Sequence, residues 1–212
     1  MFKVTQLITL KPEISVQVRE AACSEISSAA RRSEDVSLSL LQPTLAGVFN
    51  GGDLILHLQS DSANAALAMR DTKKISGVQS VESVTYEGGN AGRSGEGLTR
   101  GVYRVLLLSI KEGAPTERVA QFEKELFQMP EYISAIRAWQ LSRVSEASGS
   151  RKWTHVWEQE FSDIDGLMGP YMAHPYHWGY IDRWFDPEHQ DHIVDTHLCH
   201  TFCDFDQPII KS

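Results

Sequence analysis

Hydrophobic positions in the first 88 residues switch between the spacing of strands and the spacing of helices. Apolar side chains alternate with polar ones in the strand-like runs and recur every three to four residues in the helix-like runs. The pattern predicts strands at 2–10, 36–41, 54–58 and 78–86, an extended segment at 45–49, and helices at 15–31 and 62–74. The predicted order of elements is therefore βαββαβ.

The second half of the chain repeats this order. We expect strands at 103–110, 136–144, 153–161 and 193–202, and helices at 115–128 and 163–171, with Thr116 as a capping residue. Local sequence supports a repeat, because the run Leu-Ile-Thr-Leu-Lys that ends at Lys11 has a counterpart, Leu-Leu-Ser-Ile-Lys, that ends at Lys111. Glycine and small polar residues dominate 87–97, which is typical of a connection between units.

Two such units can cover each other. A four-stranded antiparallel sheet with both helices on one face leaves an apolar face that must be buried. We therefore predict an α+β protein in which two ferredoxin-like units pack sheet to sheet as a dimeric-type α/β barrel, within one chain or by exchange with a second chain. The expected parts are a first unit at 1–88, a linker at 89–98 and a second unit at 99–212.

Composition narrows the classes of function. The 212 residues have a formal net charge of −8 and no long basic run, which argues against a nucleic-acid surface. No apolar run approaches the roughly 18 residues of a membrane span, and the first apolar run is too short for a signal peptide. The three cysteines form no metal-type motif and no even-numbered disulfide framework, which suits a reducing compartment. Together these features lead us to expect a cytoplasmic protein without a membrane partner.

Groups that transfer protons gather late in the chain. Seven of the eight histidines and all five tryptophans follow residue 138, and the densest stretch runs from Tyr171 through His174, Pro175 and His177 to Trp178. Imidazole and phenol are well suited to proton transfer near neutral pH. If the protein is an enzyme, we expect its active site here.

This stretch resembles the stress-responsive dimeric α/β-barrel (Dabb) family. The resemblance covers about residues 101–203 and rests on the first strand ending in Lys111, the run 154–161, and the element Tyr171-x-x-His174-Pro175-x-His177. The first half resembles the family only in element order. The family includes cofactor-independent enzymes, such as the plant polyketide cyclase that makes olivetolic acid and a plant hydroxynitrile lyase. The resemblance implies that Tyr171 and His177 are a catalytic pair and that His155 faces the same pocket.

The family's histidine on the first strand is absent here, and Arg104 lies at or beside its position. A guanidinium favours an anionic substrate such as a carboxylate or a phenolate. On the strand at 153–161, alternation places Trp153, His155, Trp157 and Gln159 on one face. The candidate catalytic residues are His177 as base, Tyr171 as hydrogen-bonding acid and His155, and the candidate substrate-binding residues are Arg104, His174, Trp157 and Trp178.

Each candidate also has a structural interpretation. His174 before a proline can hold the turn, His155 can be a buried, hydrogen-bonded histidine, and the tryptophans can belong to the core. No cofactor and no metal site is expected, although His189, His192, His197 and His200 leave a metal open as an alternative. The first half can contribute only His57, so we expect one active pocket, with the first unit as its lid and partner.

The leading hypothesis is a cofactor-independent lyase or cyclase that acts on a small aromatic or polyketide-like substrate. The alternatives are a non-catalytic stress-responsive or ligand-binding barrel and, ranked lower, a barrel-type monooxygenase. A small molecule, aromatic or anionic, is the expected partner, and a homodimer stays open. Aldol closure, retro-aldol cleavage and isomerisation share the same proton transfers, so the sequence does not choose among them.

Overall fold

A computed structural model describes residues 1–32, 35–63 and 69–211 of the chain. The first unit contains β1 (Phe2–Leu10), α1 (Val16–Arg31), β2 (Val36–Pro43), β3 (Leu54–Ser60), the 3-10 turn η1 (Thr72–Lys74) and β4 (Val78–Glu87). Its strands lie where the alternation predicts them. The helix expected at 62–74 falls partly outside the described residues. The segment expected at 45–49 forms no continuous strand, and it is hydrogen-bonded to the strand Cys199–Phe205 only through Leu45 and the isolated bridge of Phe49 with His200.

The second unit repeats the arrangement with changes in its helical parts. It contains β5 (Asn90–Arg93), β6 (Gly101–Leu108), α3 (Thr116–Tyr132), β7 (Ile136–Ser148), β8 (His155–Phe161), α4 (Ile164–Gly166), the π-helical turns η2 (Leu167–Tyr171) and η3 (Tyr176–Ile181), the 3-10 turn η4 (Asp182–Trp184) and β9 (Cys199–Phe205). The helix expected at 163–171 is therefore one short α turn followed by a π turn. The last strand begins at Cys199 rather than at residue 193. Pro115, not Thr116, is the residue that precedes α3.

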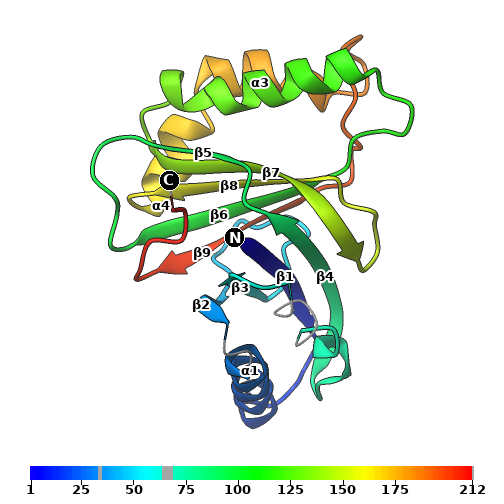
Figure 1. Ribbon diagram of the computed structural model, residues 1–212, viewed down its shortest axis with the longest axis vertical. Helices are drawn as coiled ribbons and strands as arrows, with labels where there is room; N and C mark the ends of the chain where they lie inside the picture. The colour runs from blue at the N-terminus through cyan, green and yellow to red at the C-terminus, as the bar shows by residue number, and fades with distance from the viewer. Residues whose placement is uncertain (33–34, 64–68, 212) are drawn as a thin grey trace.

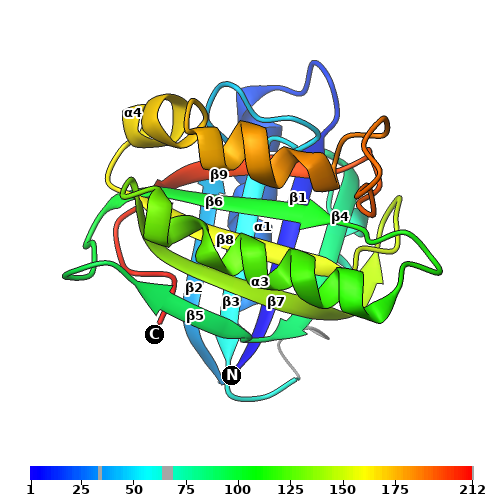
Figure 2. The same ribbon diagram turned by 90° about the horizontal axis from the view of Figure 1, so that it is seen from above.

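The two units form four layers (Figure 1). The helices of the second unit cover the outer face of its sheet, the two sheets face each other, and α1 covers the outer face of the first sheet. The strand order is β2-β3-β1-β4-β7-β8-β6-β9, and β5 from the expected linker pairs with β7. Figure 2 shows the strands of one sheet crossing behind those of the other. This is the predicted pair of ferredoxin-like units.

The two sheets are joined at one edge, a feature that the expectation of separate sheets did not include. The long strand β7 pairs with β8 along its first part, and its last part, from Val144 to Ser148, pairs with Tyr86 to Ser83 of β4. At the opposite edge the Leu45 N–H donates to the Phe202 carbonyl at 3.0 Å. The barrel therefore closes within one chain. Association of two copies stays a prediction.

Side chains fill the interior between the sheets. Tyr86, Tyr103, Val156 and Leu107 belong to one buried apolar cluster that draws on both units. Near the C-terminus, the backbone N–H groups of Ile209 and Ile210 donate to Glu160 Oε1 at 2.7 and 2.8 Å, and both isoleucines are fully buried. The space between the sheets is thus a packed core, and a ligand cavity must be sought on another face.

The helix-covered face of the second sheet carries the other set of side chains. Alternation along β6, β8 and β9 turns Arg104, Leu106, Trp157, Gln159, His200 and Phe202 toward this face, while Tyr103, Glu158 and Cys203 point into the barrel. Trp153 was expected on the face of His155, but it precedes β8 and packs in the interior cluster, where its indole N–H donates to Glu82 Oε2 at 2.8 Å.

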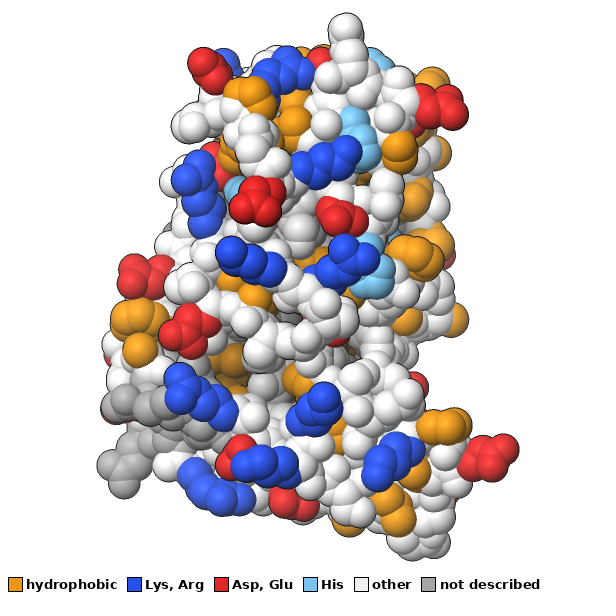
Figure 3. All heavy atoms as spheres, turned by 90° about the vertical axis from the view of Figure 1, so that its right-hand side faces the viewer, with side chains coloured by type: hydrophobic (Ala, Val, Ile, Leu, Met, Phe, Trp, Pro, Cys, Tyr) orange, Lys and Arg blue, Asp and Glu red, His pale blue; other side chains and the backbone are white. Residues whose placement is uncertain are grey.

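The surface mixes charges of both signs. Figure 3 shows basic and acidic side chains interspersed on one face, with the histidines gathered over the second unit. Among the described residues, no helix is both long and apolar enough to cross a lipid bilayer.

Candidate active site

A cavity of about 420 Å³ lies between the second sheet and the helical segment that follows β8. Arg104, Leu106, Leu198 and His200 line it from the sheet side. The helical segment contributes Tyr171, Met172, His177, Ile181, Asp182, Phe185 and Asp186. Most of the exposed surface of the lining is apolar, and the polar groups in it are one guanidinium, two imidazoles, one phenol and two carboxylates. This composition is typical of a site that binds a small molecule and orients it with a few polar groups.

Two successive π turns bring Tyr171 and His177 together. Asp163 begins the segment, because its Oδ1 accepts the Gly166 N–H at 2.8 Å. The first π turn ends at Tyr171, and Pro175 starts the second, which carries His177. The centroids of the Tyr171 and His177 rings lie 4.6 Å apart. The predicted convergence of these two side chains on one pocket is present in the structure.

Arg104 is the buried cation of the cavity. Its Nε donates to His200 Nε2 at 2.7 Å, and its Nη1 donates to Gln159 Oε1. Its Cζ lies 5.1 Å from the centroid of the Tyr171 ring, within the range of a cation–π contact. Only 3% of its surface is exposed. No carboxylate of the described residues forms an ion pair with it, and Asp182 interacts with it only at longer range, so this guanidinium can attract an anionic group of a ligand.

Both imidazoles of the cavity are neutral near pH 7. Burial and the nearby Arg104 lower the pKa of His177 to about 4 and that of His200 to about 2. Since Arg104 donates to His200 Nε2, that nitrogen carries no proton. Neither nitrogen of His177 has a hydrogen-bond partner among the described residues, and its Nδ1 is buried. His177 is therefore a neutral imidazole, and the ring nitrogen that carries no proton can act as a base.

Tyr171 is protonated under the same conditions. Burial raises the pKa of its phenol, and Arg104 opposes the increase. Its ring packs edge-on against Phe161, with centroids 5.3 Å apart. Beneath the site, Trp157 and Gln159 lie close enough to the Tyr171 hydroxyl to oppose part of this increase in pKa, although neither of their buried N–H groups reaches it with full hydrogen-bond geometry. A protonated phenol beside a neutral imidazole can donate a hydrogen bond while the imidazole accepts a proton.

The other predicted substrate-binding residues lie around the cavity rather than in its lining. His174 Nδ1 accepts the backbone N–H of Tyr176 at 3.1 Å, which holds the turn before Pro175. Trp178 is 60% exposed and donates to the Ala173 carbonyl at 3.1 Å. Trp157 is fully buried beneath the site. His174 and Trp178 therefore stabilise the local turn, and Trp157 forms part of the buried floor of the cavity.

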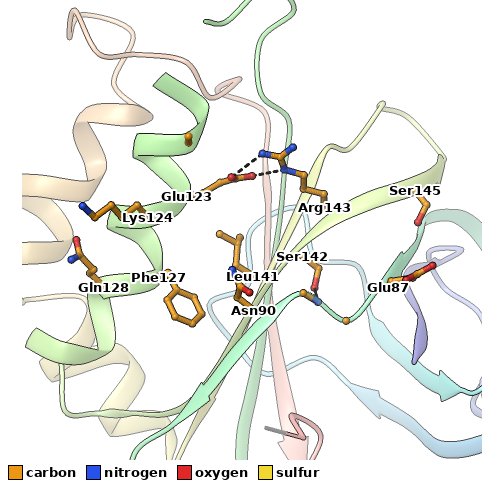
Figure 4. A pocket seen from close by; sticks show the side chains of 13 residues that line it. Glu87, Asn90, Glu123, Lys124, Phe127, Gln128, Leu141, Ser142, Arg143 and Ser145 are labelled. Carbon is orange, nitrogen blue, oxygen red and sulfur yellow. Dashed lines mark hydrogen bonds and ion pairs between the residues drawn. The ribbon is translucent and has the colours of Figure 1, made fainter. Parts of the chain in front are cut away.

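His155 lies apart from Tyr171 and His177. It is four residues from Gln159 along β8, a separation of about 13 Å in a strand. Its Nε2 is 2.9 Å from Glu123 Oε1 of α3, and burial lowers its pKa. Glu123 in turn binds Arg143 across an open groove between α3 and β7, as Figure 4 shows. His155 therefore does not line the cavity.

The remaining histidines do not assemble a metal site. Among the described residues, no three or more His, Cys, Asp or Glu side chains come together in a way that would hold a metal ion. His57 of the first unit points into the barrel, where its Nδ1 is 2.9 Å from Thr5 Oγ1. His200 and Asp182 are cavity residues that the sequence did not single out for this pocket. The pairing of Leu106 with His200 places that histidine on the face of Arg104, but this register is not visible in the sequence.

Comparisons with known proteins agree with the fold. Residues 102–196 match the model of the Stress responsive A/B Barrel Domain family, as the motif predicts, and that match does not extend to the first half. No curated protein matches the chain.

Solved structures extend the likeness to both units. An anthrone oxidase-like protein has a TM-score of 0.66 at 10% identity, covering 99% of this chain and 91% of its own. A candidate monooxygenase from Lactobacillus acidophilus has a TM-score of 0.53 at 11% identity, covering 100% and 98%. A chlorite dismutase variant from Candidatus Nitrospira defluvii has a TM-score of 0.55 at 9% identity, covering 95% and 90%. At these identities the likeness concerns the fold alone.

Proposed function

We propose that the chain, whose residues 102–196 match the stress responsive A/B barrel domain, is a cofactor-independent enzyme that moves protons on a small anionic aromatic or polyketide-like carbonyl compound. The observation that carries this proposal is the pairing of a neutral imidazole, His177, with a protonated phenol, Tyr171, in one cavity 4.6 Å apart between ring centroids. Lyase and cyclase reactions both use the same pair of groups.

Arg104 supports the choice of an anionic substrate. A carboxylate or phenolate in the cavity would gain a charge-assisted hydrogen bond from the buried guanidinium. It would also change His177, because the positive charge of Arg104 is one cause of the low pKa of that imidazole. A bound anion offsets this charge and makes His177 a stronger base in the complex than in the free protein. The apolar side chains of Leu106, Ile181 and Phe185 suit the ring of the substrate.

The proposed step starts with the proton on a carbon next to a carbonyl. The C–H bond breaks, the proton passes to a nitrogen of His177, and the electron pair forms an enolate. The Tyr171 hydroxyl donates a hydrogen bond to the enolate oxygen as that atom gains charge. In a cyclase the enolate then attacks a second carbonyl, and the alkoxide that forms takes the proton from His177; in an exchange or isomerisation reaction the enolate carbon takes a proton back from His177.

An exchange reaction tests this step without knowledge of the natural substrate. The probe is 4-acetylbenzoate, which carries a carboxylate for Arg104 and a methyl ketone with exchangeable protons. In D2O, ¹H NMR should show loss of the methyl signal faster with the protein than without it, and His177→Gln should remove the increase. His155→Gln is the matched control because His155 lies outside the cavity. A rate equal to the buffer rate, whether or not the probe binds, would contradict the proposal.

A second candidate is an oxygenase that uses the same deprotonation. The similar fold of an anthrone oxidase-like protein and of a candidate monooxygenase over nearly the whole chain favours its inclusion. In that reaction the carbanion of an anthrone reacts with O2, and anthrone plus O2 gives anthraquinone plus water. Oxygen-electrode measurements with anthrone distinguish the candidates, since exchange with 4-acetylbenzoate consumes no O2.

A further inference from the structure

The side chain of Asp182 lies beside His177 Nδ1, a buried nitrogen that has no hydrogen-bond partner among the described residues. Its Oδ2 is 4.0 Å from His177 Nδ1, and both residues line the cavity. At this distance Asp182 does not yet form a hydrogen bond with that nitrogen, and no described residue does. An imidazole acts as a base through one nitrogen only when the other holds the proton, so a neighbour that accepts the Nδ1–H determines which nitrogen is free.

The π turn explains why these two residues are neighbours. In an α-helix, residues five apart point about 140° away from each other, because successive residues turn by about 100°. The turn η3 is π-helical, and the backbone N–H of Asp182 donates to the His177 carbonyl, the i to i+5 bond of such a turn. The wider turn brings Asp182 onto the side of His177. Single π turns of this kind are frequent at functional sites.

We infer that Asp182 is a positioning residue for His177: its carboxylate accepts the Nδ1–H, which leaves Nε2 free to take the proton of the substrate. The inference rests on the proposed function for its catalytic meaning, whereas the pairing itself can be measured alone. The present gap of 4.0 Å exceeds a hydrogen bond by about 1 Å. Catalytic hydrogen bonds are often long before the substrate binds and shorten in the complex.

Other groups around His177 cannot take this role. Arg104 from β6 is a donor without acceptor capacity and repels a protonated imidazole. His200 from β9 is occupied, because its Nε2 accepts from Arg104. His174 Nδ1 is engaged by the Tyr176 backbone. Asp186 lines the same cavity, and its Oδ1 accepts the Glu188 N–H at 2.9 Å, but Asp186 does not come within 4.0 Å of a His177 nitrogen. Asp182 is the carboxylate of the cavity within 4.0 Å of the ring.

Tautomer measurements on the full chain test the pairing. With ¹⁵N-labelled histidine at pH 7 and 4-acetylbenzoate present, His177, assigned by comparison with His177→Gln, should be protonated mainly on Nδ1. Asp182→Ala should shift the proton toward Nε2, and Asp182→Glu should restore the original state. Asp186→Ala is the matched control, since it removes the same charge from the same cavity and should leave the tautomer unchanged. An unaltered tautomer in Asp182→Ala, or an equal change in Asp186→Ala, would overturn the inference.

The exchange rate separates this inference from the proposed function. If the protein exchanges the methyl protons of 4-acetylbenzoate, Asp182→Ala should lower kcat by about 10-fold to 10²-fold with little change in KM, and Asp182→Glu should recover part of the loss. An increase in KM with an unchanged kcat would contradict a positioning role. If the wild-type protein binds the probe without exchange, the proposed function fails, and the tautomer shift still decides whether Asp182 holds the ring.

Discussion

Lys3 of the first unit and Glu158 of the second form a fully buried ion pair, with 3.1 Å between Nζ and Oε1. The carboxylate also accepts a hydrogen bond from the Tyr103 hydroxyl at 2.7 Å, and Lys3 Nζ donates to Gln140 as well. The pair thus ties β1 to β8 across the inside of the barrel. Since neither charge reaches water, each depends on the other.

Removal of one partner should destabilise the whole barrel. We expect Lys3→Met to lower the free energy of unfolding by about 3–5 kcal/mol, the usual cost of leaving a charge buried and unpaired. Adding Glu158→Gln should recover part of this loss, because the orphaned charge is then gone. Urea unfolding at pH 7 measures both effects, with the exposed Lys11→Met as control. Equal stability of Lys3→Met and wild type would show that the pair contributes nothing.

Buried neutral histidines should make stability depend on pH. Burial lowers the pKa of His57, His155, His177 and His200 in the folded protein. As pH falls below about 6.5, the unfolded chain binds protons that the folded chain does not, so stability decreases toward acid pH. The raised pKa values of Glu160 and Asp182 act in the opposite direction at lower pH.

A single variant isolates one of these contributions. Between pH 6.5 and 5, His200→Gln should reduce the slope of unfolding free energy against pH by up to one proton, or about 1.4 kcal/mol per pH unit. The comparison is with the wild type and with His189→Gln, a change at a more exposed position. Identical slopes in all three proteins would mean that His200 is not held neutral in the folded state.

Arg104 should control both affinity for anions and the charge of its neighbours. We expect Arg104→Gln to weaken the binding of 4-acetylbenzoate by about 10-fold to 10²-fold, as the charge-assisted hydrogen bond is lost. The pKa of His177 should rise, because Arg104 is one of the groups that lower it. Calorimetry and histidine NMR titration measure these effects. Arg118→Gln, which disrupts an ion pair with Asp191 outside the cavity, should change neither quantity.

The sequence predicts the strands of this fold well because strand alternation is a local signal. β1 spans Phe2–Leu10 as expected, and every expected strand of the first unit is present apart from the segment at 45–49. The apolar pair Ile193 and Val194 misled the prediction of the last strand. These residues are buried in a loop, where Val194 forms a single bridge to Ile110, so their hydrophobicity reflects packing rather than a strand.

The candidate site was predictable only where a motif carried it. Tyr171 and His177 converge as their motif implies. Asp182 escaped notice because a neighbour five residues away requires a π turn, and helical spacing gives no sign of one. The family resemblance implied that His155 lies in the pocket, and the sheet face that it shares with Trp157 agreed with this, but a shared face does not fix the position along the strand. Its distance from Gln159 could have been estimated from strand geometry.

His155 should contribute to stability more than to turnover. Its Nε2 is paired with Glu123, and its ring packs edge-on against Phe122 with centroids 6.3 Å apart. We expect His155→Ala to lower the free energy of unfolding by about 1–3 kcal/mol, since a buried hydrogen-bonded group is lost. Exchange of 4-acetylbenzoate should stay within a factor of about two at temperatures where the variant is folded. A large loss of exchange rate in a folded His155→Ala protein would show that His155 takes part in the reaction.

The last prediction concerns the catalytic pair itself. His177→Ala should lower the exchange rate by about 10²-fold to 10⁴-fold, the usual contribution of a positioned base, while leaving the fold intact because its side chain faces the cavity. Tyr171→Phe should slow the reaction by removing the hydrogen bond to the enolate, and its ring should still pack on Phe161.

The pH dependence of the same reaction identifies the base. In the free protein, the pKa of His177 is about 4, so kcat/KM should fall only as pH drops toward that value, where the imidazole takes a proton. Thermal melts beside the kinetics separate chemistry from folding. Full activity of His177→Ala at unchanged stability would exclude His177 as the base. Unfolding of both His177→Ala and Tyr171→Phe would instead indicate that the pair holds the helical segment on the sheet.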